Sequence, residues 1–194
     1  PSRNGWTQTV GGVCTEVKPP IYFEVEYLNQ EQDPPMFLDI QEIESDDYLD
    51  YYLEKKLSWN GILIEPHPRL YHECKLNRTS IAYNYAISDI TGELDFVCYQ
   101  QEPAGNSGLL KTFRKPDILA TVQHEIIKVK VETLTNILDK SNAPRHIEYL
   151  DIDVEGHELN VLKSIDFKKY SFSYIGCETD PNRPGHRWRE ISEF

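Results

Sequence analysis

The stretch Gly61-Ile62-Leu63-Ile64-Glu65-Pro66-His67-Pro68 joins an apolar run to the start of a helix. The apolar residues have the length of a buried strand, and the run closes on a carboxylate. The prolines suit the first turn of a helix, where a backbone N–H has no intrahelical partner to lose. Residues at helical spacing continue that helix, namely Leu70, Tyr71, Cys74 and Asn77. The stretch therefore predicts a strand that leads directly into a helix.

The alternation of strand and helix extends in both directions from this stretch. Upstream, Met36–Ile40 is another short apolar run, and residues 48–57 place leucines and tyrosines at helical spacing. Downstream, residues 81–87 alternate as a third strand. The remaining predicted elements are strands at 93–99, 126–131, 147–153 and 174–178, helices at 133–138 and 158–163, and a long polar loop with a short helix at 100–123. This order predicts an α/β fold, with a mostly parallel sheet that carries helices on both faces.

The first 35 residues differ in character from the rest of the chain. They contain scattered glycines and prolines, and only Ile21–Val25 has the composition of a strand. We interpret residues 1–35 as an N-terminal extension and residues 36–194 as the domain. A chain of 194 residues suits one such domain with a single core.

Charge and hydropathy limit the possible partners. The chain has 32 acidic and 20 basic residues, for a formal net charge of −12. Such a field repels the phosphates of nucleic acids and of anionic lipids, so we expect no nucleic-acid partner. No stretch approaches the roughly 20 apolar residues that a membrane-spanning helix requires, so we expect no membrane span.

The four cysteines are spread singly along the sequence, without the close pairs that cysteine metal sites use. Buried free thiols and two disulfides both remain open. Asn77-Arg78-Thr79 fits the glycosylation acceptor pattern. A cytoplasmic and a secretory-lumenal location are therefore both compatible with the sequence. Asp153, Glu155 and Glu178 could bind a divalent cation, yet no motif demands one, and we expect no metal.

Acidic residues recur where the predicted strands end. Ligands of parallel α/β sheets bind beyond the carboxyl ends of the strands, near the switch in strand order. The residues at these ends are Asp39, Glu65, Asp89, Asp151, Asp153, Glu155 and Glu178. We therefore expect the chemistry of the protein to lie at this edge.

Three stretches resemble one family, the FkbM-type S-adenosylmethionine-dependent methyltransferases. Residues 61–68 are similar to its second strand and following turn, and residues 83–92 to its third strand and turn. Residues 150–163, with Asp-Val-Glu-Gly-His-Glu before an apolar helix, resemble its most recognisable motif. The resemblance covers residues 36–178. It implies a Rossmann-like methyltransferase fold and S-adenosylmethionine as the cofactor.

The resemblance also implies roles for individual residues. Glu65 matches the acid that hydrogen-bonds the ribose hydroxyls of the cofactor, and Ser88 with Asp89 matches the turn near the adenine. Asp39 matches the acid of the first turn, and Glu158 either faces the cofactor or begins its helix. Asp153, Glu155 and His157 are the candidates for a catalytic base or for orienting the substrate. For His157, a plain histidine at a helix start is the alternative.

The sequence departs from the family at the glycine turn after the first strand. Gln41 stands where the first glycine is expected, and its β-carbon could block the methionyl part of the cofactor. Two functions therefore remain open. The first is methyl transfer to a hydroxyl oxygen of a small-molecule or glycan-like substrate, and the second is an inactive pseudo-methyltransferase that binds a protein partner.

The end of the sequence leaves a further question about the sheet. Relatives of this class commonly finish with a helix and an antiparallel hairpin, whereas this chain stops at Phe194. Either the strands at 93–99 and 126–131 complete the sheet, or the last elements of the fold are missing.

Overall fold

The computed structural model describes residues 34–40, 49–101, 104–113, 116–178 and 187–194, all within one compact unit, residues 34–194. The strand expected at 21–25 and the turn that contains Gln41 lie outside the described residues. The elements in chain order are β1 (Met36–Ile40), α1 (Leu49–Leu57), β2 (Asn60–Ile64), α2 (Pro68–Asn77), β3 (Ile81–Tyr83), β4 (Ala86–Ile87), β5 (Gly92–Tyr99), the 3-10 helix η1 (Ala104–Asn106), β6 (Gly108–Leu109), α3 (Pro116–Thr121), β7 (His124–Glu132), α4 (Leu134–Lys140), β8 (His146–Ile152), α5 (Glu158–Lys163), β9 (Ser171–Cys177) and α6 (Trp188–Glu193).

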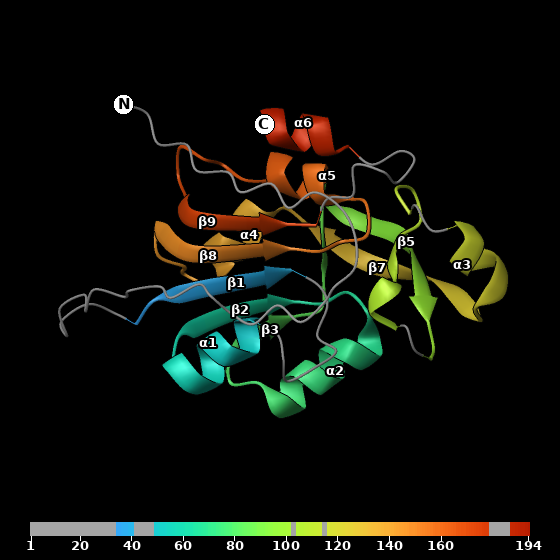
Figure 1. Cartoon of the computed structure of the whole chain (residues 1–194), viewed down its shortest axis with the longest axis horizontal. Helices are drawn as coiled ribbons and strands as arrows, with labels where there is room; N and C mark the ends of the chain where they lie inside the picture. Colours follow the sequence, from blue (N-terminus) through green and yellow to red (C-terminus); the bar gives the residue numbers. More distant parts are fainter. Residues whose placement is uncertain (1–33, 41–48, 102–103, 114–115, 179–186) are drawn as a thin grey trace, which may run out of the picture. The chain divides into compact units, whose positions relative to one another are not determined.

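Five parallel strands form the first sheet, here called sheet A, in the order β3-β2-β1-β8-β9 (Figure 1). The chain adds β2 and then β3 on one side of β1, and later places β8 and β9 on the other side. The strand order therefore switches direction between β1 and β8, which is where ligands bind in open α/β sheets. The prediction of an α/β fold with a mostly parallel sheet is confirmed.

Helices cover both faces of sheet A because alternate residues of each strand point to opposite faces. Leu38 and Ile40 of β1 belong to the main core cluster, which also holds buried residues of α4 and α5. Phe37 lies on the other face, in a smaller cluster with Leu53 of α1 and Cys74 of α2. The burial of both strand faces explains why the strands are continuous apolar runs.

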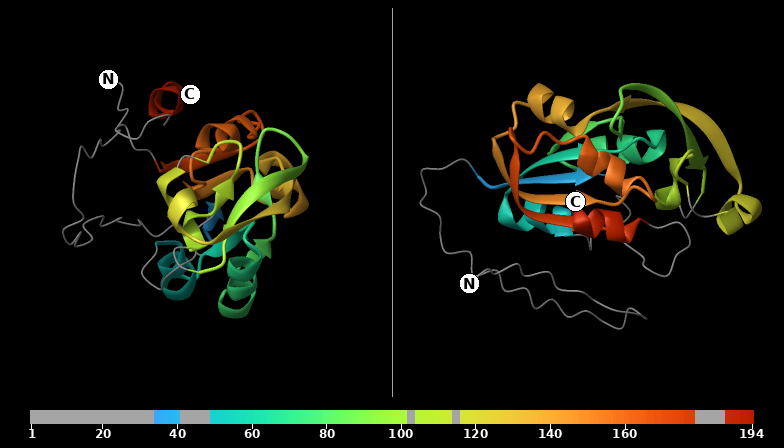
Figure 2. Two further views of the ribbon diagram at one scale, coloured as in Figure 1. Left: turned by 90° about the vertical axis from the view of Figure 1, so that its right-hand side faces the viewer. Right: turned by 90° about the horizontal axis from the view of Figure 1, so that it is seen from above.

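Four strands form a separate sheet, sheet B, in the order β4-β7-β5-β6. Its main pairing is antiparallel, between residues 92–99 of β5 and 124–131 of β7. The alternative in which these strands complete the parallel sheet is therefore wrong. In Figure 1 the arrowheads of sheet A point towards β5 and β7, and the view from above in Figure 2 agrees. Sheet B thus lies beyond the carboxyl ends of sheet A, where the strand order places the site.

The prediction of a single strand at 81–87 is also wrong, because the chain passes from sheet A to sheet B within these residues. β3 pairs with β2 in sheet A, and β4 pairs with β7 in sheet B. Between them, the side-chain amide of Asn84 donates to the carbonyl oxygens of Glu65 and Pro66. These bonds tie the turn to the end of β2, so the strand cannot continue past it.

The helices follow the expected boundaries closely. α5 spans the predicted residues 158–163, and α1 begins one residue later than expected. Thr133 caps α4, since its hydroxyl oxygen accepts from the Asn136 N–H at 3.2 Å. Among the residues that the structure describes, no helix has the length and apolar character needed to cross a membrane.

Candidate active site

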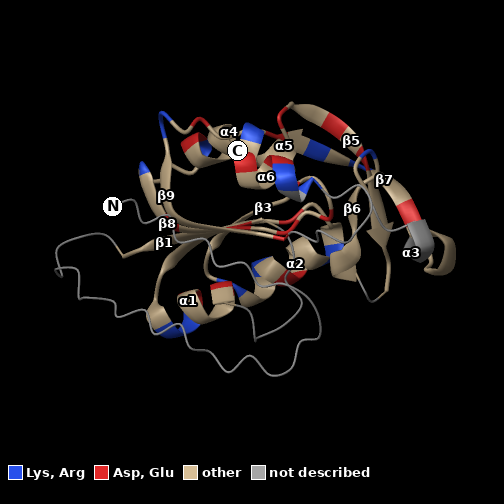
Figure 3. Cartoon of the chain, turned by 45° about the horizontal axis from the view of Figure 1, so that its top comes forward, with Lys and Arg blue, Asp and Glu red and all other residues tan. Residues whose placement is uncertain are grey.

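The strand register brings distant acids to one edge of sheet A. Ile64, Ile40, Ile152 and Cys177 lie in line as the last paired residues of β2, β1, β8 and β9. The residues that follow β2, β8 and β9 therefore lie at the same edge. Glu65, Asp153 and Glu178 occupy these positions, and Figure 3 shows acidic ribbon segments, in red, where the strands end. The structure thus brings three of the acids that the sequence placed at strand ends to one edge.

Glu65 is fully buried directly after β2. Its carboxylate oxygen Oε1 accepts from the backbone N–H of His67 at 2.6 Å. Its own N–H donates to the carbonyl of Tyr83 at 3.0 Å, which continues the ladder between β2 and β3. A carboxylate fixed in this way is a suitable acceptor for the hydroxyl groups of a ligand.

Replacing Asn84 with alanine should loosen the turn that holds Glu65. The Asn84 amide donates to the Glu65 carbonyl at 2.8 Å and to the Pro66 carbonyl at 3.0 Å, and both bonds would be lost. We expect the free energy of unfolding to fall by about 1 to 2 kcal/mol in urea titrations. Asn136→Ala is the matched control, because the exposed Asn136 amide binds only the Glu132 carboxylate in a surface pair. Equal losses in the two variants would contradict the role given to Asn84.

Three carboxylates meet at the ends of β8 and β9. One oxygen each from Asp153, Glu155 and Glu178 lies within 4.8 Å of the others. Glu155 is buried, and its backbone has a positive φ of 55°. Burying its charged carboxylate costs free energy unless the charge is compensated. Carboxylates in such a group can take up a proton from a substrate or hold a divalent cation. The absence of a metal stays a prediction.

His157 lies inside a chain of hydrogen bonds. Its Nε2 lies 2.9 Å from the Ser88 hydroxyl, and its Nδ1 lies 2.9 Å from the Thr112 hydroxyl. The Ser88 hydroxyl donates to the Asp89 carboxylate at 3.1 Å, and Asn160 donates to the same carboxylate oxygen at 2.9 Å. A consistent assignment runs from Thr112 through His157 and Ser88 to Asp89. The hydrogen bonds therefore connect His157 with Ser88 and Asp89, to which the sequence had given a different role.

The same bonds limit what His157 can do. Burial is the main reason that the pKa of His157 falls to about 4, and the charge of Asp89 opposes that fall. The imidazole is therefore neutral at pH 7, with one nitrogen donating and the other accepting. In this arrangement neither nitrogen is available to take a proton from a substrate. Its catalytic role stays a prediction, and the geometry favours positioning of the turn at 88–89.

Glu158 is the first residue of α5, in agreement with one of its two expected roles, the start of a helix. It is buried, and its carboxylate accepts from the Gly156 N–H at 2.7 Å. A carboxylate in the first turn of a helix is also favoured by the partial positive charge there. Glu158 thus stabilises the turn that carries Glu155, and its contact with a cofactor stays a prediction.

Asp39 lies on the same face of β1 as Phe37, the face towards α1 and α2, and its role beside the cofactor stays a prediction. It is buried, and burial, with the charges of Asp50 and Asp151, raises its pKa well above the ordinary value. Nearby, the Arg78 guanidinium binds Asp50 at 2.6 Å and Glu54 at 3.1 Å. Sequence reasoning missed this network, because Arg78 and its partners are more than 20 residues apart and form no motif.

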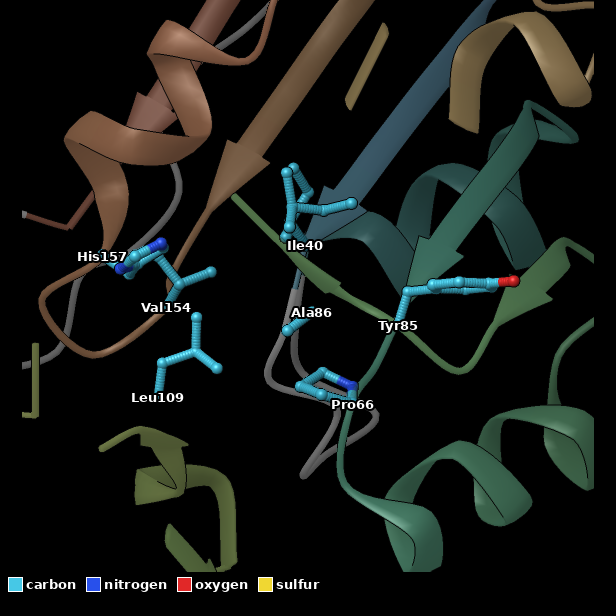
Figure 4. A pocket seen from close by; sticks show the side chains of 8 residues that line it. Ile40, Pro66, Tyr85, Ala86, Leu109, Val154 and His157 are labelled. Atoms are coloured by element: carbon cyan, nitrogen blue, oxygen red, sulfur yellow. The ribbon is translucent and has the colours of Figure 1, made fainter. Parts of the chain in front are cut away.

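Two hollows lie beside the strand ends. The smaller has a volume of about 10 Å³, and Figure 4 shows the side chains around it, which are Ile40, Pro66, Tyr85, Ala86, Ile87, Leu109, Val154 and His157. The larger has a volume of about 370 Å³ and is lined by residues that include Pro68, Tyr71, Tyr83, Asn84, Lys128 and Lys130. Pro66 and Tyr85 line both hollows. The two spaces are thus neighbours at Pro66, the residue that follows Glu65.

One comparison with known proteins gives a match. The sequence model of the methyltransferase FkbM domain matches residues 40–194. No curated protein and no solved structure matches the chain. The matched region contains Glu65, the turn at 88–89 and the acids after β8.

Proposed function

The chain belongs to the FkbM methyltransferase family, and we propose that it transfers a methyl group from S-adenosylmethionine to a hydroxyl oxygen. The family generally uses this cofactor. The observation that carries the proposal is the position of Glu65, buried at the end of β2, on the same edge as the acids that follow β8. The two groups flank the end of β1, where the strand order switches.

The residues at this edge fit an adenosine-bearing cofactor in their chemistry. Glu65 would accept from the ribose hydroxyls, while Ser88 and Asp89 would lie near the adenine. The larger hollow is lined by Pro66 and Asn84, and its volume of about 370 Å³ is within the range of small-molecule sites. Its lining does not include Glu65, Ser88 or Asp89. S-adenosylmethionine supplies a methyl group on a positively charged sulfur, and the displacement of that sulfur is an in-line reaction.

The protein must then position the acceptor and remove its proton. Asp153 and Glu155 are the groups that we propose for this proton transfer, because their carboxylates meet just after β8, one of the two strands at the switch in strand order. The protein would also hold the cofactor and the acceptor in line. Such positioning alone can lower the activation free energy of the methyl transfer by several kcal/mol. A small-molecule or glycan-like hydroxyl would suit these acceptor groups.

Titrating the protein with S-adenosylmethionine in a calorimeter tests the proposal. We expect micromolar binding by the native protein, and at least a tenfold loss of affinity in Glu65→Gln, which removes a charged acceptor. Glu73→Gln is the matched control, since Glu73 lies on α2 in an exposed pair with Arg69. Absence of heat at millimolar cofactor, with the native protein folded, would refute cofactor binding.

A second function has its own support. Gln41 replaces the expected glycine, and the smaller hollow holds only about 10 Å³, room for roughly one water molecule. Both observations favour a pseudo-methyltransferase that has lost its cofactor and binds a protein partner. Gln41→Gly distinguishes the two functions. Binding that appears only in this variant would favour the pseudo-methyltransferase, and equal binding by the native protein would favour the enzyme.

A further inference from the structure

The ring of His67 connects three parts of the fold. The residue is buried directly after Pro66, between Glu65 and the start of α2. Its Nε2 lies 2.9 Å from the carbonyl oxygen of Tyr99, the last residue of β5 in sheet B. Its Nδ1 lies 3.1 Å from the N–H of Arg69 in the first turn of α2. The ring thus joins the turn after β2 to a helix and to the second sheet.

These two contacts determine which nitrogen of His67 carries the proton. The Arg69 N–H can only donate, so Nδ1 must accept and carries no proton. The Tyr99 carbonyl can only accept, so Nε2 must carry the proton. Burial lowers the pKa of His67, in agreement with a neutral ring. The two hydrogen bonds therefore fix the orientation of the His67 ring and its tautomer, with the proton on Nε2.

The orientation of the ring also fixes the backbone of the same residue. The His67 N–H donates to Glu65 Oε1 at 2.6 Å, and this bond helps to orient the Glu65 carboxylate. If the ring lost its hydrogen bond to Tyr99, the turn at residues 65–67 would lose this link to β5. The N–H would then no longer be held against the carboxylate.

We propose that His67 is a positioning residue for the cofactor: it binds the end of β5 and thereby aims the Glu65 carboxylate at the ribose. This inference rests on the proposed function. It makes sheet B part of the cofactor site, although no strand of sheet B pairs with sheet A among the described residues. His67 acts through Glu65 and needs no contact with the cofactor itself.

Two substitutions separate the two contacts of the ring. In His67→Asn, the amide oxygen lies the same number of bonds from Cα as Nδ1, so it can still cap α2 but cannot reach Tyr99. In His67→Gln, the amide nitrogen lies the same number of bonds from Cα as Nε2, so it can still donate to Tyr99. His72→Asn, on the exposed face of α2, is the matched control.

The first measurement is cofactor affinity by calorimetry, at pH 7.5, for the native protein and the three variants. We expect His67→Asn to bind S-adenosylmethionine on the order of tenfold more weakly, as the loss of one buried hydrogen bond allows. His67→Gln should retain affinity to within roughly threefold, and His72→Asn should match the native protein. Native affinity in His67→Asn, or an equal loss in the Asn and Gln variants, would overturn the proposal.

The second measurement needs no cofactor, so it remains informative if the proposed function fails. Cys98 is buried in β5 with its sulfur 3.3 Å from His67 Nε2, and burial raises the pKa of this thiol to about 11. Opening of the contact with Tyr99 should expose Cys98, so peptide-resolved alkylation should be faster in His67→Asn than in His67→Gln. Equal alkylation rates would show that the His67 ring does not hold the turn against β5. This result by itself would refute the proposal.

Discussion

Replacing Arg78 with methionine should lower the free energy of unfolding by about 3 to 5 kcal/mol at pH 7. The Arg78 side chain is only 2 % exposed, and it binds the carboxylates of Asp50 and Glu54, which are 7 % and 2 % exposed. Methionine would fill a similar volume without a charge. The buried Asp50 carboxylate would then lose its cation, while Glu54 would keep its pair with Lys55 at 2.8 Å. Leaving one buried carboxylate without its cation is far more costly than the loss of a surface pair. Urea unfolding curves of the native and variant proteins give this difference.

Two further variants separate the loss of the Arg78 charge from the change in side-chain shape. Arg187→Met removes an arginine from an exposed pair with Glu190 and should cost no more than about 0.5 kcal/mol. Adding Asp50→Asn to Arg78→Met removes the carboxylate charge that has lost its cation and should restore part of the lost stability. If the double variant is less stable than Arg78→Met alone, the buried charge is not the reason for the loss.

Glu54 shows why this network matters for the site. Besides Arg78, its carboxylate accepts from the N–H and hydroxyl groups of Thr79 and Ser80, directly before β3. The network therefore joins α1 to the segment that leads into β3. β3 in turn supplies the carbonyl of Tyr83 that fixes the backbone of Glu65. A buried ion network on one face of sheet A thus supports the edge where we place the cofactor.

The parallel sheet could be predicted because its signals are local. Residues 36–40 and 61–65 are short apolar runs that end near an acid, and each is followed by residues at helical spacing. Buried strands leave such runs regardless of what surrounds them. The motif at 153–158 indicated the family in the same way, and the family model confirms that resemblance.

Sheet B could not be predicted, because its separation from sheet A depends on a contact across the fold. Residues 81–87 alternate as one strand would, and no residue among them forbids continuation. The break follows from the Asn84 bonds to Glu65 and Pro66, 19 and 18 residues away. Hydrogen bonds between such distant residues leave no periodic pattern in the sequence.

Asp39 illustrates a second limit of reasoning from strand ends. The acid is one residue before the end of β1, and successive side chains in a strand point to opposite faces. Ile40 consequently lines the smaller hollow, while Asp39 lies among Asp50, Asp151 and their partners. A shift of a single residue in the strand boundary decides between these positions, and sequence patterns do not fix boundaries that closely.

Acidification should destabilise the fold through His157 by about 3 kcal/mol between pH 6.5 and pH 4. The unfolded chain takes up a proton at this histidine near its ordinary pKa of 6.5, whereas burial lowers the pKa in the folded state to about 4. Over that range the unfolded state binds more protons, so stability falls as the pH falls. Each pH unit is worth about 1.4 kcal/mol. Urea titrations at a series of pH values measure the slope.

A comparison with His157→Asn isolates the contribution of His157 to the pH dependence, because the asparagine side chain does not titrate in this range. The native protein and the variant share every other titrating group, including Asp39, whose raised pKa gives a contribution of opposite sign. The difference between the two stability curves should therefore narrow towards pH 4. A constant difference from pH 7 to pH 4 would mean that His157 takes up its proton at the same pH in the folded and unfolded states. The hydrogen-bond chain from Thr112 to Asp89 would then have to be assigned differently.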